Sequence, residues 1–305
     1  MRQLDAELRR FFARRIVRGT FLIAAVIIVV VVTIGTAKGH PGSQFSLDPA
    51  TGRVVDTATG RVVANKSRGG IPSQFGGTDD QGRIFFGASD TRTNIGKDLA
   101  NVLEGTGVAL LFAAFALGAS FVGAEFNVGS LTTQLLFEPR RWRVHLAKSV
   151  AVAVGAATLA LAVMVFVALA MYIGSELNGV VRGLDGAFLA RRIAQALRVA
   201  AVVGVGAMLA YSVTLVAKRS SAGMTTFFLQ FVLLNLIRPD KMPFGPISHY
   251  APVRGLLAIV VKHTDATGIQ ERAIHTMAGG VVLTAVWVVV IVAGSGFLFA
   301  RAEVR

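Results

Sequence analysis

Six long apolar runs without a single charged residue constrain this chain more than any other feature. They lie at residues 19–37, 105–123, 149–173, 199–217, 220–237 and 277–300. A helix needs roughly 20 mostly apolar residues to cross about 30 Å of hydrocarbon. Runs this long and continuous are typical of helices, because a membrane-spanning strand would alternate apolar and polar residues. The sequence therefore predicts an all-α polytopic membrane protein with six transmembrane helices, the run at 220–237 being the weakest of the six.

The composition supports a membrane protein. Of the 305 residues, 53% are hydrophobic and only 16% are charged, whereas a soluble domain carries about 25% charged residues. The formal net charge is +14, which on a soluble protein would suggest nucleic-acid binding. Here the basic residues fall in short segments between apolar runs, so we expect no nucleic-acid partner. The chain has no cysteine, which excludes disulfides and thiolate metal sites.

The short basic segments predict the orientation. Arginines and lysines gather in 1–18, in 124–148, at Lys218 and Arg219, and in the tail 301–305. Six spans place all of these on one side, which the positive-inside rule makes cytoplasmic. Arginines in the outer loop 174–198 depart from the rule, among them Arg182, Arg191 and Arg192. We therefore expect a multi-pass protein of the cell membrane with both termini in the cytoplasm.

Residues 1–18 carry an amphipathic pattern. Apolar side chains recur there at three- and four-residue spacing: Leu4, Leu8, Phe11, Phe12 and Ile16. Such a helix can lie in the membrane interface, with its arginines against anionic lipid. Two alternatives stay open, a merely cationic segment that sets topology and a cleaved signal peptide. Five further apolar runs downstream argue against the signal peptide.

Two outer segments carry structure of their own. Residues 38–104 contain a short duplication, Ala-Thr-Gly-Arg-Val-Val at 50–55 and again at 58–63. Valine pairs separated by glycine turns favour short strands, so we expect a small, partly β extracytoplasmic segment that packs on the membrane part or on an accessory subunit.

In the outer loop 238–276, residues 251–261 are too short to span the membrane. They fit a re-entrant or interfacial helix, or a buried loop helix.

Several kinds of chemistry are missing from the sequence. Gly96-Lys97 is followed by Asp98 and belongs to no phosphate-binding loop, so we expect no ATP hydrolysis by this chain. The five histidines show no metal-ligand spacing, and no metal site is predicted. No apolar run carries paired carboxylates, which weakens the case for an ion-coupled carrier. We therefore do not expect an enzyme.

The segment 124–148 is the most informative stretch between the runs. It contains Glu125, then Gly129-Ser130-Leu131, Leu135-Leu136, Pro139-Arg140-Arg141, and finally Lys148. The leucines give one apolar stripe and Pro139 ends it, which predicts a short cytoplasmic helix. The arginines after Pro139 can meet lipid headgroups or an acidic partner.

This order of residues resembles the ABC-2 family of ABC exporter permeases. In that family the second span ends in Glu, a Gly-Thr/Ser-Leu follows, then a Leu-Leu turn with Pro and Arg, and then a Lys that enters the third span. Ser130 stands where Thr is usual, and Phe137-Glu138 stands where a small residue often precedes Pro. The resemblance implies that the segment is a coupling helix, with Glu125, Gly129, Pro139, Arg140 and Arg141 as coupling residues. For the charged residues, plain topogenic charge and helix capping are the alternative roles.

The same resemblance implies a function. Two permease chains, identical or related, would form the translocation path for a drug-like, lipidic or peptide substrate. Two separate ATPase subunits would bind ATP and Mg, with no cofactor on this chain. Thr226 and Gln230, one turn apart, would line the path or only hydrogen-bond between helices. The alternative function is a non-transporting membrane scaffold or sensor whose outer segment binds a ligand or partner.

Overall fold

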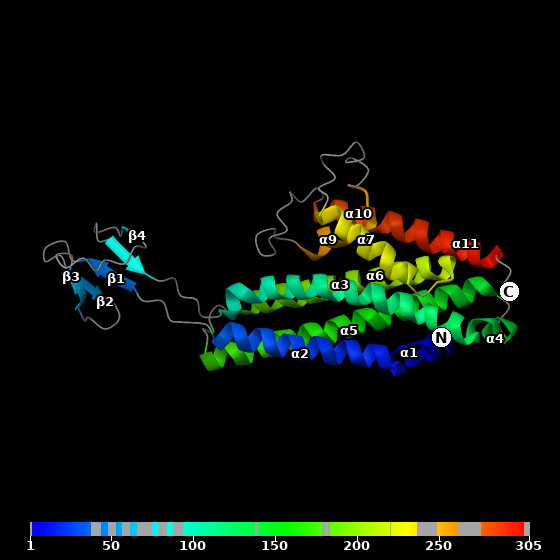
Figure 1. Ribbon diagram of the computed structural model, residues 1–305, viewed down its shortest axis with the longest axis horizontal. Helices are drawn as coiled ribbons and strands as arrows, with labels where there is room; N and C mark the ends of the chain where they lie inside the picture. Colours follow the sequence, from blue (N-terminus) through cyan, green and yellow to red (C-terminus); the bar gives the residue numbers. More distant parts are fainter. Residues whose placement is uncertain are drawn as a thin grey trace. The chain divides into compact units, whose positions relative to one another are not determined.

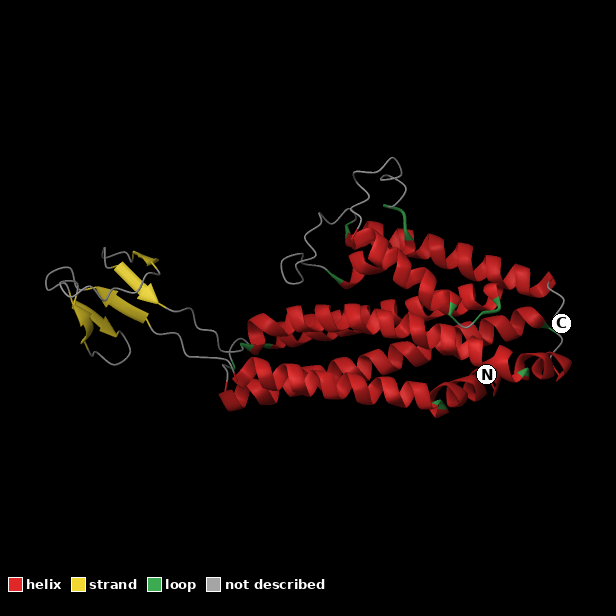
Figure 2. Cartoon of the chain, in the orientation of Figure 1, coloured by secondary structure: helices red, strands yellow, loops and turns green. Residues whose placement is uncertain are grey.

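The computed structural model describes most of the chain, which divides into two compact units. The described residues are 2–37, 44–47, 53–56, 62–65, 75–78, 84–87, 94–137, 140–178, 181, 184–219, 221–236, 249–261 and 276–301. The first unit consists of Met1–Ile28, Lys97–Leu169 and Leu184–Arg305. The second consists of Val29–Gly96 and Ala170–Gly183. Figure 2 distinguishes the helices of the chain from its strands.

Helices make up most of the described chain (Figure 1). They are α1 (Arg2–Ala13), α2 (Arg15–Ala37), α3 (Ile95–Val128), α4 (Ser130–Phe137), α5 (Arg141–Asn178), α6 (Gly186–Ala217), α7 (Ala222–Leu236), α9 (Pro252–Val260), α10 (Met277–Val288) and α11 (Gly294–Arg301). A π-helical turn, η3 (Val289–Ala293), joins α10 to α11. The start of α1, the helix α4 and the end of α11 lie at the same end of the first unit (Figure 1).

Five short strands form an antiparallel sheet in the second unit. They are β1 (Gln44–Leu47), β2 (Arg53–Asp56), β3 (Val62–Asn65), β4 (Phe75–Thr78) and β5 (Ile84–Gly87), in the order β3-β2-β1-β5-β4. The valine pairs of the duplicated sequence fall in β2 and β3, which pair with Val54 opposite Ala64 and Val55 opposite Val62. The valine pairs of the duplication thus lie on two paired strands.

Four helices of the described chain are long and apolar enough to cross a membrane. They cover Asp98–Phe126, Arg141–Leu177, Gly186–Ala217 and Met277–Arg301, as expected of a mainly helical, membrane-embedded protein. The spans expected at 19–37 and 220–237 are not among them, and the 15-residue α7 is shorter than the roughly 20 residues that a span needs. Six spans therefore stay a prediction.

The helices α3, α5 and α6 extend well beyond the expected apolar runs. α3 begins ten residues before 105, α5 begins at Arg141 and not at 149, and α6 begins at Gly186 and not at 199. The expected outer loop 174–198 is therefore largely helical. In 124–148, where the sequence predicts a short helix and a basic turn, α3 and α5 continue on either side of the short helix α4. The physical reason is local, because arginine, lysine, leucine and alanine favour helix even where charge excludes them from hydrocarbon. Asp185 also caps α6 by accepting a 2.6 Å hydrogen bond from the Phe188 backbone amide.

The helix α6 packs closely against three neighbours through glycine. A Cβ on Gly118 of α3 would lie 2.0 Å from the Ala207 carbonyl oxygen of α6. A Cβ on Gly204 of α6 would lie 2.5 Å from the Ala153 carbonyl oxygen of α5, and one on Gly223 of α7 would lie 2.3 Å from the Ala210 carbonyl oxygen. Only glycine permits backbones to approach this closely, as at the packing interfaces of membrane helices.

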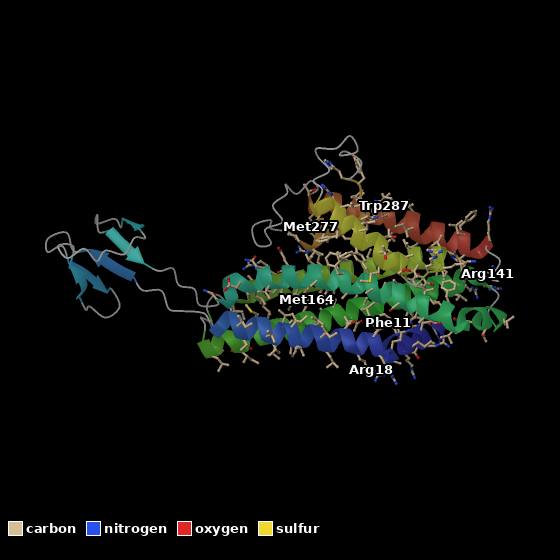
Figure 3. The ribbon with its side chains drawn as sticks, viewed as in Figure 1. Phe11, Arg18, Arg141, Met164, Met277 and Trp287 are labelled. Carbon is tan, nitrogen blue, oxygen red and sulfur yellow. The ribbon has the colours of Figure 1, made fainter. Side chains whose placement is uncertain are left out.

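The short helix α9 is buried. Val253, Leu256 and Val260 are fully enclosed, and α9 packs against α10 and α6. Trp287 of α10 (labelled in Figure 3) donates a 2.7 Å hydrogen bond from Nε1 to the Tyr250 carbonyl oxygen just before α9. This packing is compatible with a re-entrant helix and with a buried loop helix, so the alternatives for 251–261 stay open.

The N-terminal helix ends earlier than the sequence predicts. α1 stops at Ala13, and Arg14 separates it from α2, so the amphipathic stretch is not one helix over 1–18. Phe11 is 1% exposed and packs against Phe121 of α3 and Gly155 of α5 (Figure 3). Phe12 and Ile16 are exposed. Part of the apolar face of α1 therefore packs on protein, and its position in a membrane interface remains a prediction.

Candidate functional site

Four charged side chains meet inside the first unit, beside the start of α5. They are Glu7 of α1, Arg14 between α1 and α2, Glu125 of α3 and Lys148 of α5, which we call the buried charge cluster. The side chains of Glu7, Glu125 and Lys148 are 3%, 6% and 1% exposed. Two carboxylates and two cations balance in formal charge, which a buried group of this kind requires.

Lys148 is the centre of the cluster. Its ammonium Nζ lies 2.8 Å from Oε1 of Glu125 and 3.2 Å from Oε1 of Glu7. One cation therefore bridges two carboxylates from helices that are far apart in the sequence. Burying such charges costs several kcal/mol per ion unless hydrogen bonds and opposite charges compensate them. The bridge fixes where α1, α3 and α5 meet.

Glu7 also connects the cluster to α4. Its Oε1 accepts a 3.0 Å hydrogen bond from Nε2 of Gln134 on α4 and a 3.2 Å hydrogen bond from Arg10. Gln134 is half-buried, whereas Ser130, Thr133 and Leu136 on the same short helix are exposed. A displacement of α4 would therefore reach Glu7 directly and Lys148 through it.

Arg14 completes the cluster from the side of the N-terminal segment. Its Nη1 donates a 3.0 Å hydrogen bond to the Ser120 carbonyl oxygen, its Nη2 lies 3.7 Å from Oε1 of Glu125, and its guanidinium lies over the Phe121 ring at 4.2 Å. Burial lowers the pKa of Arg14, while Glu125 and Glu7 act in the opposite direction. An arginine keeps its proton in a protein, so the cluster retains this positive charge.

The buried charge cluster joins several segments of the chain through its ion pairs and hydrogen bonds. Its acids are both bound through Oε1, and no described residue hydrogen-bonds to Oε2 of Glu7 or of Glu125. In the described chain no group of three or more potential metal ligands comes together. What the cluster can do is hold four chain segments in one arrangement and resist any other, a role attested for buried polar groups in some proteins.

The structure separates the predicted coupling residues into two groups. Glu125 is buried in the cluster, where it contacts Lys148 and Arg14, so in this conformation it is not exposed to a peripheral partner. Gly129 has a φ of +70°, a backbone conformation that favours glycine, and it forms the break between α3 and α4. Arg140 is exposed and Arg141 is half-buried in the first turn of α5. Pro139 lies outside the described residues.

The two residues proposed for the translocation path share α7 but differ in surroundings. Thr226 is exposed, whereas Gln230 is half-buried. Oε1 of Gln230 is buried and has no hydrogen-bond partner among the described residues. These exposures do not test whether the two side chains line a path, and that role stays a prediction.

Sequence reasoning missed most of the cluster. Glu7 and Arg14 were treated as part of an interfacial helix, and Gln134 was not singled out at all. One signal was present for Glu7, because it lies three residues after Leu4 and four before Phe11 and so falls on the apolar side of its helix. A charge on an apolar stripe indicates a buried partner. No signal in the sequence identified Lys148 as that partner.

Charged residues also lie inside the long helices at their other ends. Glu104 of α3 is 2% exposed. Nearby on α6, Arg192 donates a 2.6 Å hydrogen bond from Nη1 to Gln195, whose Nε2 donates a 3.0 Å hydrogen bond to the Ala100 carbonyl oxygen of α3. The expected spans were free of charge, but the longer helices of the structure are not. Gln195 and Arg192 help to fasten α6 to α3.

Comparison with protein-family models and with curated proteins finds no match for this chain. The function must therefore be argued from the residues and their geometry.

Proposed function

We propose that the chain is the permease subunit of an ATP-driven exporter of the ABC-2 type. The observation that carries the proposal is the segment from Glu125 to Lys148. It folds into the end of α3, a glycine break, the short helix α4 and a basic start of α5, in the order of residues that resembles this family. A peripheral ATPase needs such a short element on the membrane protein to push on.

The proposed coupling has two stages. The exposed side of α4 and the exposed Arg140 form the surface on which an ATPase subunit docks. Movement of α4 then passes from Gln134 to Glu7 and through Lys148 to Glu125, so that α1, α3 and α5 shift as one. Charge-assisted contacts of 2.8–3.2 Å support this route, because such hydrogen bonds are short and about twice as strong as neutral ones.

The remaining features of the proposal concern assembly and direction. Two permease chains, identical or related, form the path between them, and separate ATPase subunits supply the ATP and Mg sites. The shared end of α1, α4 and α11 (Figure 1) supports cytoplasmic termini in the cell membrane, where the basic residues face inward. The substrate class is drug-like, lipidic or peptide, and it moves outward. An accessory extracytoplasmic subunit is a further candidate partner for 38–104.

One experiment separates this proposal from the alternative function. The tagged full-length chain is purified from its native membrane in mild detergent after brief crosslinking, and co-purifying proteins and crosslinked peptides are identified by mass spectrometry. We expect a stoichiometric subunit with an ATP-binding phosphate loop, crosslinked within 129–143. Recovery of the chain without any ATPase, even after crosslinking, would favour the scaffold or sensor.

The docking surface can be tested by charge reversal. Arg140→Glu is expected to reduce the amount of ATPase that co-purifies by at least about fivefold, as loss of a good exposed ion pair of about 1 kcal/mol predicts. Arg219→Glu is the matched control, since Arg219 is an exposed arginine just after α6 and is predicted to face the same side. Equal losses for the two variants, or none for either, would contradict the assignment of Arg140.

A further inference from the structure

The last long helix contains a π-helical turn. η3 (Val289–Ala293) interrupts the α-helical path between α10 and α11. π-helical turns are rare, arise from one extra residue in a helix, and are frequent at functional sites. They also allow a helix to bend, because the extra residue disturbs the regular ladder of hydrogen bonds. The contacts that stabilise this turn therefore affect how the helix can bend.

His145 of α5 contacts the π-helical turn. Its ring is 0% exposed, and Nε2 lies 3.1 Å from the Val292 carbonyl oxygen and 3.3 Å from Oγ of Ser295. Because a carbonyl only accepts hydrogen bonds, Nε2 must carry the proton and donate it to Val292. The Ser295 hydroxyl donates to the same oxygen at 3.0 Å. The side chains of Ser295 and, from another helix, His145 thus both donate hydrogen bonds to the Val292 carbonyl oxygen of the turn.

The surroundings fix the His145 ring. It stacks on Tyr211 of α6 with ring centroids 5.7 Å apart, and it touches the rings of Trp142 and Phe299. Trp142, one turn earlier on α5, packs so closely on α11 that a Cβ on Gly296 would lie 1.8 Å from its ring. The start of α5 and the helix around the turn are therefore held together by a hydrogen bond and by close packing.

We infer that the π-helical turn is a joint in the last long helix and that His145 is the positioning residue that fixes its state from the start of α5. His145 and Lys148 are three residues apart on the same helix, so a shift of α5 moves the buried charge cluster and the hydrogen bond to Val292 at once. Displacing His145 removes one of two donors to the turn and frees the turn to return to α-helical register. This inference does not depend on an ATPase partner.

The test is hydrogen exchange of the full-length chain in phosphatidylcholine nanodiscs, read by mass spectrometry on peptides that cover 289–296. His145→Phe keeps a ring but removes the donor, and it is expected to raise exchange in this segment by about tenfold, as loss of one hydrogen bond to a buried acceptor predicts. His145→Gln, which keeps an N–H donor near Nε2, is expected to restore most of the protection. Ser149→Ala is the control, because the buried Ser149 hydroxyl donates its hydrogen bond to the Leu146 carbonyl oxygen within α5 and not to the π-helical turn.

The outcomes separate a positioning role from a merely structural one. A rise confined to 289–296 that His145→Gln reverses supports the joint. Unchanged exchange in that segment overturns it, and so does an equal rise across α3, α5 and α6, since general loosening would show His145 to be packing alone. If His145→Phe yields no folded protein, His145→Asn takes its place, because its shorter amide cannot reach Val292, and the same local rise is required.

Discussion

Replacing Lys148 with methionine is expected to lower the free energy of unfolding by about 3–5 kcal/mol, because the change leaves two carboxylates buried without their bridging cation. Methionine fills similar space, so the loss measures charge and not volume. The measurement is unfolding of the purified chain by SDS titration in a fixed detergent, followed by far-UV circular dichroism.

Two companion variants make this result specific. Arg9→Met removes the ion pair between Arg9 and Asp5, whose side chains are 82% and 64% exposed, and it should change stability by no more than about 0.5 kcal/mol. Adding Glu7→Gln to Lys148→Met should recover part of the loss, because the neutral amide no longer needs the cation and Glu125 keeps its ion pair with Arg14. A Lys148 variant as stable as the Arg9 variant would show that the charges are not coupled.

The second large effect is expected at Gly118. A Cβ there would lie 2.0 Å from the Ala207 backbone oxygen, and a backbone atom cannot rotate aside, so Gly118→Ala must separate α3 from α6. We expect a loss of at least about 3 kcal/mol, seen as a much lower unfolding midpoint or as failure to recover monodisperse protein by size-exclusion chromatography.

Gly105→Ala is the matched control in the same helix. Apart from the neighbouring backbone of α3 itself, no atom of the described residues lies within 4 Å of the Cβ that this change would add. Alanine also favours helix over glycine by up to about 1 kcal/mol. The variant should therefore be as stable as the natural chain or slightly more stable. If Gly118→Ala and Gly105→Ala behaved alike, the close approach of α3 and α6 would be wrong.

Apolar pattern predicted the class of fold but not the ends of its helices. Uncharged runs mark where a helix can lie in hydrocarbon, and they identified the cores of α3, α5, α6 and the helix at 277–301. The helices continue past those runs because helix formation depends on local backbone preference and capping, as at Asp185, and not on hydropathy. Charged residues that lie outside the apolar runs, such as Lys148 and Arg192, are therefore parts of the long helices.

The site was less predictable than the fold. Glu125 and Lys148 could be singled out in one segment of sequence, but their contact with Glu7 joins residues more than a hundred positions apart. Pairing over such a distance depends on how helices pack, which periodicity does not encode. The glycines were more informative, since small residues in apolar runs favour close packing, and Gly204, Gly280 and Gly296 are all in tight contact. Gly294, by contrast, has open space around it.

The closely packed α6 also has a consequence for how the chain is made. The helices α3 and α5 are synthesised before α6. Gly118 and Ala153 therefore leave the ribosome before the α6 backbone that packs against them exists. The interior of the first unit can close only after residue 217 has been synthesised. Until then α3 and α5 stay in the bilayer or bound to an insertion factor, and their unpacked faces can form non-native contacts. A pause in translation after α5 would lengthen that interval, and a chain truncated before α6 would be a substrate for quality-control proteolysis.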